Sequence, residues 1–264
     1  MKLNFPLPNI PQRDPKPRNN GLTMMMDKGL SLREAENVIS ASGHLIDLVK
    51  FGFGTSLVST ELEEKIKLYK EANIIPYFGG TLFEIFLVRG KADDFLKYVE
   101  SYKLDTIEVS DGSIKLPHDE KLRFIEKYAK NFRVLSEVGS KMANVAISDD
   151  QWLAMTQNEL KAGAWKVIAE AREAGNVGIY KPDGTANKEL ISHIIEAVPA
   201  ENVLWEAPNK NQQVWFIKLL GANVNLGNIA PMDLIPLETL RLGLRGDTFF
   251  EYLPKDVQGK YMQK

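Results

Sequence analysis

The sequence predicts an α/β fold, a single (β/α)8 TIM barrel with parallel strands, and three observations support this prediction. The chain has 264 residues, which is long for an ordinary domain but normal for such a barrel. Short apolar runs alternate with helical patterns along it. Three of these runs end in Glu137, Glu170 and Glu206, which lie 33 and 36 residues apart, about the length of one strand-plus-helix unit. An open, doubly wound sheet is the alternative.

Eight apolar runs carry the strand signal. They are too apolar for half-exposed antiparallel strands, as expected for parallel strands that are covered on both faces. In chain order, the expected strands are residues 22–27, 45–52, 74–78, 106–110, 134–138, 166–171, 203–207 and 224–229.

The segments between these runs carry helical patterns. Ser31 followed by Glu34 is a capping box, which predicts the start of the first helix. Apolar residues at helical spacing predict further helices within residues 62–69, 122–129, 190–198 and 214–220, the last one capped by Gly221. Helices are also expected near 84–103 and 150–162, and at 234–244 after the last strand.

One catalytic domain with two extensions is the expected organisation. Residues 1–20 contain five prolines and form an irregular N-terminal arm. Residues 21–250 form the (β/α)8 barrel catalytic domain, and residues 251–264 form a polar C-terminal tail. Phe249, Phe250 and Tyr252 near the carboxyl end suggest self-association, so we expect a homo-oligomer.

Composition excludes several classes of function. The net charge of −2 and a pI near 6.0 give no reason to expect nucleic acid or an anionic membrane as a partner. The chain has no cysteine, which excludes disulfides, zinc–thiolate sites and thiol nucleophiles. The first residues lack a secretory apolar core, and no stretch is long enough to span a bilayer. A cytoplasmic location is therefore expected.

Charged side chains are expected to gather at the carboxyl ends of the strands, the opening that we call the mouth. Active sites of parallel α/β barrels are built there. Because side chains alternate along a strand, residues two apart share a face. The residues expected to face the mouth are Glu137, Glu170, Glu206, Lys50, Arg172 and Asn225.

The chemistry of this set suits a metal and an anionic substrate. Carboxylate oxygens are the ligands that Mg²⁺ prefers, and buried carboxylates are costly unless a cation compensates them. Structural ion pairs are the alternative interpretation for each glutamate. Lys50 either extends from a strand end towards solvent or takes part in phosphate binding or proton transfer.

Two glycine-containing loops are weaker candidates for anion binding. The loop at residues 52–56 resembles a dinucleotide fingerprint, but Leu57 stands where the third glycine is required. Gly227 and Asn228 lie at the end of the eighth apolar run, where barrels commonly bind phosphate.

A series of short motifs resembles the phosphosulfolactate synthase family, including its plant heat-stress-associated relatives. The resemblance covers residues from about 16 to 250, with the motifs in the right order. These motifs are KPR at 16–18, GLT at 21–23, DKGL at 27–30, KFGFGTS at 50–56, GGTLFE at 79–84, EVSDG at 108–112, SEVG at 136–139, EARE at 170–173, NVNLGNI at 223–229 and LRGDT at 244–248. Phe53 stands where the family commonly has tryptophan.

The resemblance implies a carbon–sulfur lyase that adds sulfite to phosphoenolpyruvate in a Mg²⁺-dependent step, giving 2-phospho-3-sulfolactate. In archaea this product feeds coenzyme M biosynthesis, and in some bacteria it leads to sulfolactate. The implied partners are therefore these two small molecules.

The resemblance also implies roles for individual residues. Mg²⁺ bound by Glu137, Glu170 and Glu206 would stabilise negative charge as a Lewis acid. Glu170 is catalytic, and Lys141 and Lys50 are both candidates to protonate C2 of the substrate. The residues expected to bind phosphate, carboxylate or sulfonate are Arg18, Lys50, Arg172, Asn225, Gly227 and Asn228.

Two other functions stay open from the sequence. One is another barrel lyase or aldolase that acts on a phosphorylated enol or keto acid. The other is a non-catalytic stress-associated protein on the same fold, since fold does not determine function.

Overall fold

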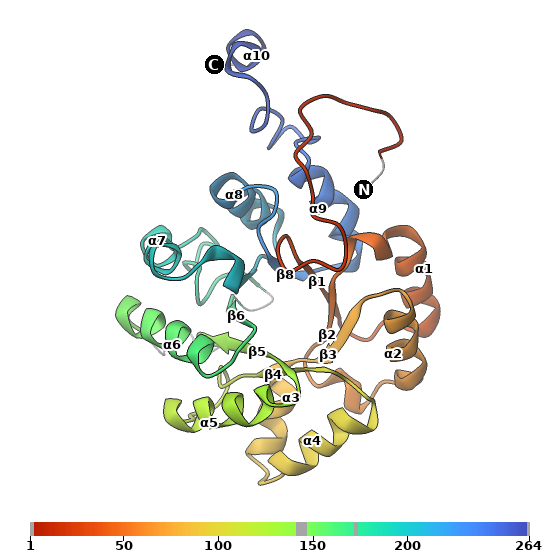
Figure 1. The fold of residues 1–264 in the computed structure, drawn as a ribbon, viewed down its shortest axis with the longest axis vertical. Helices are drawn as coiled ribbons and strands as arrows, with labels where there is room; N and C mark the ends of the chain where they lie inside the picture. The colour runs from red at the N-terminus through yellow and green to blue at the C-terminus, as the bar shows by residue number, and fades with distance from the viewer. Residues whose placement is uncertain (1–2, 141–146, 172–173, 263–264) are drawn as a thin grey trace.

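The computed structural model describes residues 3–140, 147–171 and 174–262. Within these residues, eight parallel strands form one sheet that curls into a nearly closed barrel, and helices surround it (Figure 1). The strands are β1 (Thr23–Asp27), β2 (Leu48–Phe51), β3 (Ile75–Phe78), β4 (Thr106–Val109), β5 (Arg133–Val138), β6 (Lys166–Ala169), β7 (Val203–Glu206) and β8 (Leu226–Ile229). The predicted (β/α)8 barrel is confirmed.

The order of the strands around the barrel is β3-β2-β1-β8-β7-β6-β5-β4. The first and last of these, β3 and β4, lie side by side and bring the sheet round on itself. The register pairs Met26 with Lys50 and Lys50 with Tyr77, so residues from successive strands lie at the same height. Side chains from many strands therefore meet at the mouth.

Most of the predicted helices form, and the capping box of Ser31 and Glu34 is present at the start of α1. The prediction of a single helix near residues 84–103 is wrong. It is two helices, because Gly90 between them has a φ of +67°, which a right-handed helix does not accommodate. The helices are α1 (Leu32–Ser42), α2 (Leu62–Glu71), α3 (Gly80–Leu87), α4 (Ala92–Ser101), α5 (His118–Ala129), α6 (Asp149–Lys161), α7 (Lys188–Ala197), α8 (Lys210–Leu220), α9 (Leu234–Arg241) and α10 (Lys255–Tyr261).

The apolar core has two layers that follow the alternation of side chains along the strands. The larger layer lies between the sheet and the helices and includes Val49 and Phe51 of β2. The smaller layer fills the interior of the barrel with Leu22, Met24, Leu48, Tyr77, Leu135, Ile168 and Leu204. This interior layer forms an apolar floor under the side chains of the mouth.

Arginine side chains tie the N-terminal arm to the amino end of the barrel. Arg13 forms an ion pair of 3.0 Å with Glu238 of α9 and donates to the carbonyl of Ala222. Arg241, which is fully buried, donates to the carbonyls of Ala222 and Val224. The segment around Arg13 is therefore part of the barrel's packing, although it contains neither helix nor strand.

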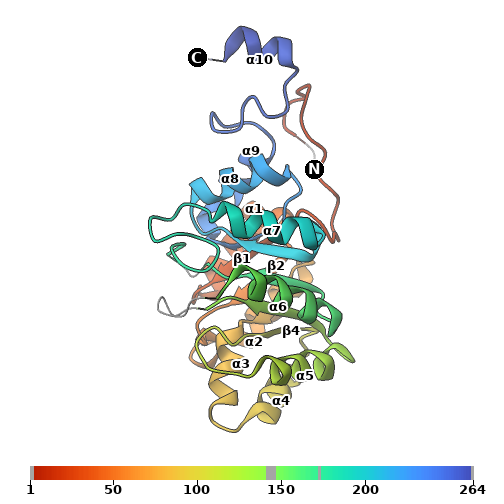
Figure 2. The ribbon, with the colours of Figure 1, turned by 90° about the vertical axis from the view of Figure 1, so that its left-hand side faces the viewer.

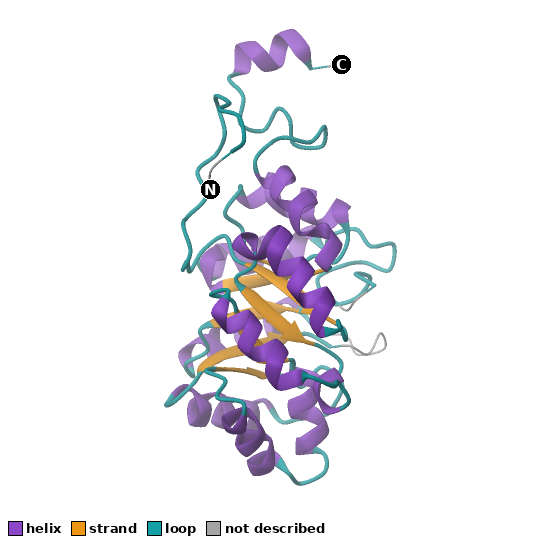
Figure 3. Cartoon of the chain, turned by 90° about the vertical axis from the view of Figure 1, so that its right-hand side faces the viewer, coloured by secondary structure: helices purple, strands orange, loops and turns teal. Residues whose placement is uncertain are grey.

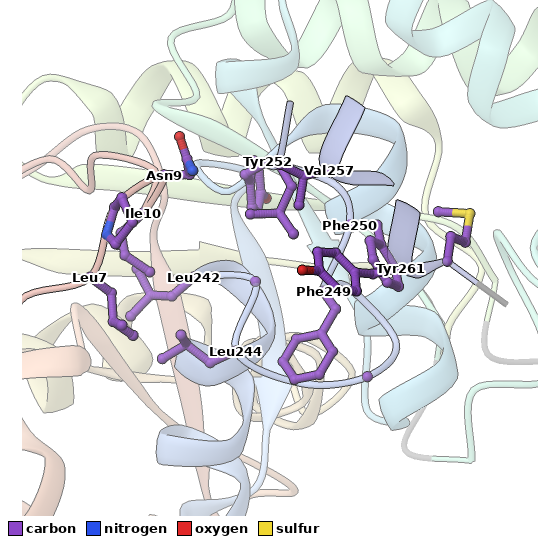
Figure 4. A pocket seen from close by; sticks show the side chains of 15 residues that line it. Leu7, Asn9, Ile10, Leu242, Leu244, Phe249, Phe250, Tyr252, Val257 and Tyr261 are labelled. Atoms are coloured by element: carbon purple, nitrogen blue, oxygen red, sulfur yellow. The ribbon is translucent and has the colours of Figure 1, made fainter. Parts of the chain in front are cut away.

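The arm and the C-terminal tail both extend from the same end of the molecule, beyond α8 and α9 (Figures 2 and 3). Between them lies an apolar groove of about 840 Å³, which we call the tail groove (Figure 4). Phe249, Phe250 and Tyr252 line it. The expected homo-oligomer stays a prediction. Among the described residues, no helix is long and apolar enough to cross a membrane.

Candidate active site

Glu137, Glu170 and Glu206, here called the acidic trio, come together at the mouth. Glu137 lies in β5, Glu170 directly follows β6, and Glu206 ends β7. One carboxylate oxygen from each residue lies within 4.8 Å of the other two, and all three residues are buried. The three strands are parallel neighbours, so their carboxyl ends bring these side chains to a common point.

Lys50 of β2 places its ammonium against these carboxylates. Its Nζ is 3.4 Å from Glu137 Oε2 and 3.5 Å from Glu206 Oε1. Glu108 Oε1 of β4 lies nearer, at 3.0 Å. Burial lowers the pKa of Lys50, but the three carboxylates outweigh burial and hold this pKa well above its ordinary value. Lys50 is therefore a buried cation inside an acidic site.

Two more carboxylates border the trio, and neither was predicted as a site residue. Glu108 Oε1 accepts a hydrogen bond of 2.6 Å from the backbone N–H of Gly80 at the start of α3. Ser110 Oγ lies 2.6 Å from Glu84 Oε1 and 2.7 Å from Glu137 Oε1, and so links α3 to the trio. A signal for Glu108 was present, because it also interrupts an apolar strand. Its strand continues for one residue, as the strand of Glu137 does, so the strand-end pattern could have been extended to Glu108.

The acidic trio and Lys50 line a hollow of about 620 Å³ at the mouth. Phe53 and Asn228 also line it, and both have a φ of +56°. Residues other than glycine adopt this backbone conformation at a cost in free energy, and residues in such conformations concentrate at functional sites. Among the described residues, no donor reaches the buried side-chain oxygen of Asn228. The amide of Asn228 is therefore placed to bind a ligand in the hollow.

Two glycines allow the backbone to approach Glu170 closely. A Cβ on Gly139 would lie 2.6 Å from the Cβ of Glu170. A Cβ on Gly178 would lie 1.9 Å from the carbonyl oxygen of Glu170. Both glycines also have a positive φ, so the position of Glu170 depends on the absence of side chains at these two sites.

A buried lysine supports the trio from outside the barrel. Lys121 of α5 has no exposed side-chain surface, and its Nζ donates to the carbonyl oxygen of Glu137 over 2.5 Å. Asp111 and Glu159 each lie 2.8 Å from the same Nζ. Burial lowers the pKa of Lys121, but these two carboxylates outweigh it, so that the net shift is upward. Lys121 therefore stays charged and fixes the end of β5.

Two of the predicted substrate-binding residues lie at the opposite end of the barrel, which corrects their assignment. Arg18 forms an ion pair of 2.9 Å with Asp47, just before β2. Asn225 precedes β8, and its amide bonds to the backbone of Leu22 and Val203. Three residues of a strand span about 10 Å, so Asn225 lies about that far from Asn228, towards the amino end of the barrel. The alternation of side chains predicts which face of the strand Asn225 lies on, but not how far along the strand it lies.

Three other predicted residues complete the comparison. Lys141 and Arg172 lie outside the described residues. Gly227 lies in β8 and faces the barrel interior, where a Cβ would be 2.8 Å from Met24. The mouth therefore brings together Lys50, Glu137, Glu170, Glu206 and Asn228.

The donor set fits a divalent cation with a preference for oxygen ligands. Three buried carboxylates offer oxygens close enough to share one ion. Lys50 adds one positive charge beside them through its ion pairs with Glu137 and Glu206. Carboxylate oxygens that converge in this way are the ligands that Mg²⁺ prefers.

The chain is similar to known proteins along most of its length. The model of the family described as (2R)-phospho-3-sulfolactate synthase (ComA) matches residues 11–247. The chain is 43% identical to phosphosulfolactate synthase of Bacillus subtilis over 244 residues, covering 91% of this chain and 97% of that protein. It is 40% identical to phosphosulfolactate synthase of Methanothermobacter thermautotrophicus, covering 90% and 95%.

A more distant relative is a plant protein. The chain is 23% identical to Protein HEAT-STRESS-ASSOCIATED 32 of Arabidopsis thaliana over 260 residues, covering 87% of this chain and 88% of that protein. The similarity therefore extends along nearly the whole barrel in bacterial, archaeal and plant proteins.

Proposed function

The chain belongs to the (2R)-phospho-3-sulfolactate synthase family, and from this premise we propose that it adds sulfite to phosphoenolpyruvate to give 2-phospho-3-sulfolactate. This reaction would place it among the carbon–sulfur lyases. The single observation that carries the proposal is the acidic trio beside Lys50, buried in one hollow at the mouth of the barrel.

The proposed reaction sets three requirements for the site. The lone pair of the sulfite sulfur forms a bond to C3 of phosphoenolpyruvate, and the π electrons of the double bond move towards C2. A proton is then added to C2, and the phosphate ester is kept. The site must hold two anions together, stabilise the negative charge that develops near C2 and the carboxylate, and deliver one proton.

Positive charge beside the substrate supports the second requirement. Mg²⁺ held by the acidic trio would act as a Lewis acid for the negative charge that develops on the substrate. The ammonium of Lys50 adds a fixed positive charge beside the trio. The amide of Asn228 adds a neutral polar group that favours one orientation of the substrate.

The proton for C2 is proposed to come from Lys141 or Lys50. Lys50 lines the hollow, whereas Lys141 lies outside the described residues and rests on the family resemblance. Arg172 keeps its proposed role in binding phosphate or sulfonate on the same ground. A cytoplasmic location and a homo-oligomeric state also remain parts of this proposal.

The direct test is ³¹P NMR of the purified protein with phosphoenolpyruvate, sulfite and Mg²⁺. We expect the phosphoenolpyruvate resonance to be replaced by that of a new phosphate ester only when sulfite and Mg²⁺ are both present. Consumption with another nucleophile instead of sulfite would indicate a different barrel lyase. An unchanged spectrum with folded protein would refute the proposed activity.

A further inference from the structure

Two successive residues of the loop after β6 hold the strand ends that carry two members of the acidic trio. The backbone N–H of Ile179 donates to the carbonyl oxygen of Glu170 over 3.1 Å. The hydroxyl of Tyr180 donates to the carbonyl oxygen of Glu206 over 2.7 Å. One dipeptide therefore connects the ends of β6 and β7 at the level of the site.

The hydroxyl of Tyr180 is itself held firmly. Tyr180 is buried and forms an isolated antiparallel bridge with Ala186. Its ring meets the ring of Phe216 edge-on, at 6.5 Å between centroids, and Phe216 stacks on Trp205 of β7 at 5.0 Å. Burial raises the pKa of Tyr180 well above its ordinary value, so the hydroxyl keeps the proton that it donates.

The third member of the trio is held in an equivalent way. Lys121 donates to the carbonyl oxygen of Glu137, as described above. The backbone carbonyl of each trio residue therefore accepts a hydrogen bond from a helix or loop on the outside of the barrel. Such contacts set how far each carboxylate reaches into the mouth, and metal sites respond strongly to shifts of this kind.

We propose that Tyr180 is a positioning residue for the metal site, which it shapes through the backbone of Glu206. This inference rests on the proposed function in one respect, that the acidic trio binds a divalent cation. It adds a residue that touches neither metal nor substrate, and it assigns a role to the loop of residues 174–187. Removing the hydroxyl leaves the carbonyl of Glu206 without this donor, and the end of β7 is then free to shift away from β6.

The test is the affinity of Tyr180→Phe for Mn²⁺, measured by electron paramagnetic resonance of unbound Mn²⁺ without substrates. We expect the dissociation constant to rise about tenfold, as for loss of an outer-shell partner. Tyr128→Phe is the matched control. Tyr128 is equally buried in the outer core, and among the described residues its hydroxyl has no hydrogen-bond partner. Its affinity should equal that of the wild type.

A second measurement separates positioning from general damage. At saturating Mn²⁺, Tyr180→Phe should recover most of the wild-type kcat, because the metal itself then draws the ligands together. Wild-type Mn²⁺ affinity in Tyr180→Phe, or an equal loss in Tyr128→Phe, would overturn the inference.

Failure of the proposed function gives a different pattern. Weakened Mn²⁺ binding in Tyr180→Phe, in a protein that forms no product from phosphoenolpyruvate and sulfite, would uphold the positioning role and refute the substrates. Product formation by the wild-type protein, with Mn²⁺ binding in Tyr180→Phe as tight as in the wild type, would support the proposed substrates and refute the positioning role.

Discussion

The ammonium of Lys50 lies 3.0 Å from the carboxylate of Glu108, and this contact joins β2 to β4. The hydrogen-bonded order of the sheet ends at β3 and β4, so the ion pair spans the place where the barrel closes. The same ammonium faces Glu137 and Glu206. Lys50 therefore has two effects: it helps to close the barrel, and it offsets negative charge at the proposed metal site.

Lys50→Met tests this double effect. Removing one partner of a buried ion pair leaves uncompensated charge, so the free energy of unfolding without metal should fall by about 3–5 kcal/mol. Without the ammonium, the acidic trio should attract Mg²⁺ more strongly. A ligand that binds only the folded state stabilises it more when it binds more tightly, so Mg²⁺ should raise the melting temperature of Lys50→Met more than that of the wild type. Calorimetry with and without Mg²⁺ measures both effects. An equal rise in the two proteins would contradict the charge-compensation argument.

Gly178→Ala tests the close approach of the loop to Glu170. The added Cβ would lie 1.9 Å from a carbonyl oxygen at a φ of +65°, so the loop or Glu170 must move. A misplacement of about 1 Å at a catalytic group costs about 100-fold in kcat/KM, which is the loss expected here. Gly259→Ala is the control, because nothing lies within 4 Å of its added Cβ and its activity should be unchanged. Similar activity of both variants would argue against this constraint.

Lys121→Met tests the support from outside the barrel. Asp111 and Glu159 would lose the cation that lies 2.8 Å from each of them. We expect the free energy of unfolding to fall by about 3–5 kcal/mol in urea denaturation. Lys127 lies on the same helix and pairs with Asp93 at the surface, so Lys127→Met should cost less than about 1 kcal/mol. Comparable losses in the two variants would show that burial does not decide the effect.

Glu34 provides a pH test of the first helix. Hydrogen bonds from the backbone and hydroxyl of Ser31 lower the pKa of Glu34 below its ordinary value of 4.5 in the folded protein. The unfolded chain then binds this proton at a higher pH than the folded chain does. The stabilisation is therefore complete above about pH 4.5 and is lost as the pH falls through the folded-state pKa.

Glu34→Gln should remove this part of the pH dependence. Urea denaturation at about pH 6 and about pH 3 should show a smaller loss of unfolding free energy in Glu34→Gln than in the wild type. Glu196→Gln, on an exposed part of α7, serves as the control for the change of charge. The same pH dependence in Glu34→Gln and the wild type would contradict the capping contribution.

The barrel and the acidic trio could be predicted because both follow from local patterns. Apolar runs give parallel strands, and a glutamate that ends a buried strand must face a polar opening. Asn225 was placed wrongly because the alternation of side chains does not fix how far along the barrel axis a residue lies, and Arg18 was placed wrongly because its role was taken from a sequence motif in the arm, which carries no position in the fold. Hydrogen bonds to Asp47 and to Leu22 hold them at the amino end.

The supporting residues were not predictable in the same way. Tyr180 reaches Glu206, and Lys121 reaches Glu137, only after distant elements have packed together. Neither residue has a local pattern that marks this role. Gly90 is a further example. The spacing of apolar residues predicted one helix near residues 84–103, but the left-handed conformation of Gly90 separates this segment into two helices.

The central claim is that the acidic trio binds one divalent cation, and Mn²⁺ titration of Glu170→Gln tests it most directly. The wild type should bind one Mn²⁺ per chain, and the control Glu196→Gln should match it. Loss of an outer-shell partner costs about 10–100-fold in metal affinity, so loss of a direct ligand in Glu170→Gln should weaken Mn²⁺ binding by at least about 100-fold. Glu170→Gln should also lose Mg²⁺-dependent turnover, with an unchanged circular dichroism spectrum. One Mn²⁺ bound to Glu170→Gln with wild-type affinity would contradict the account.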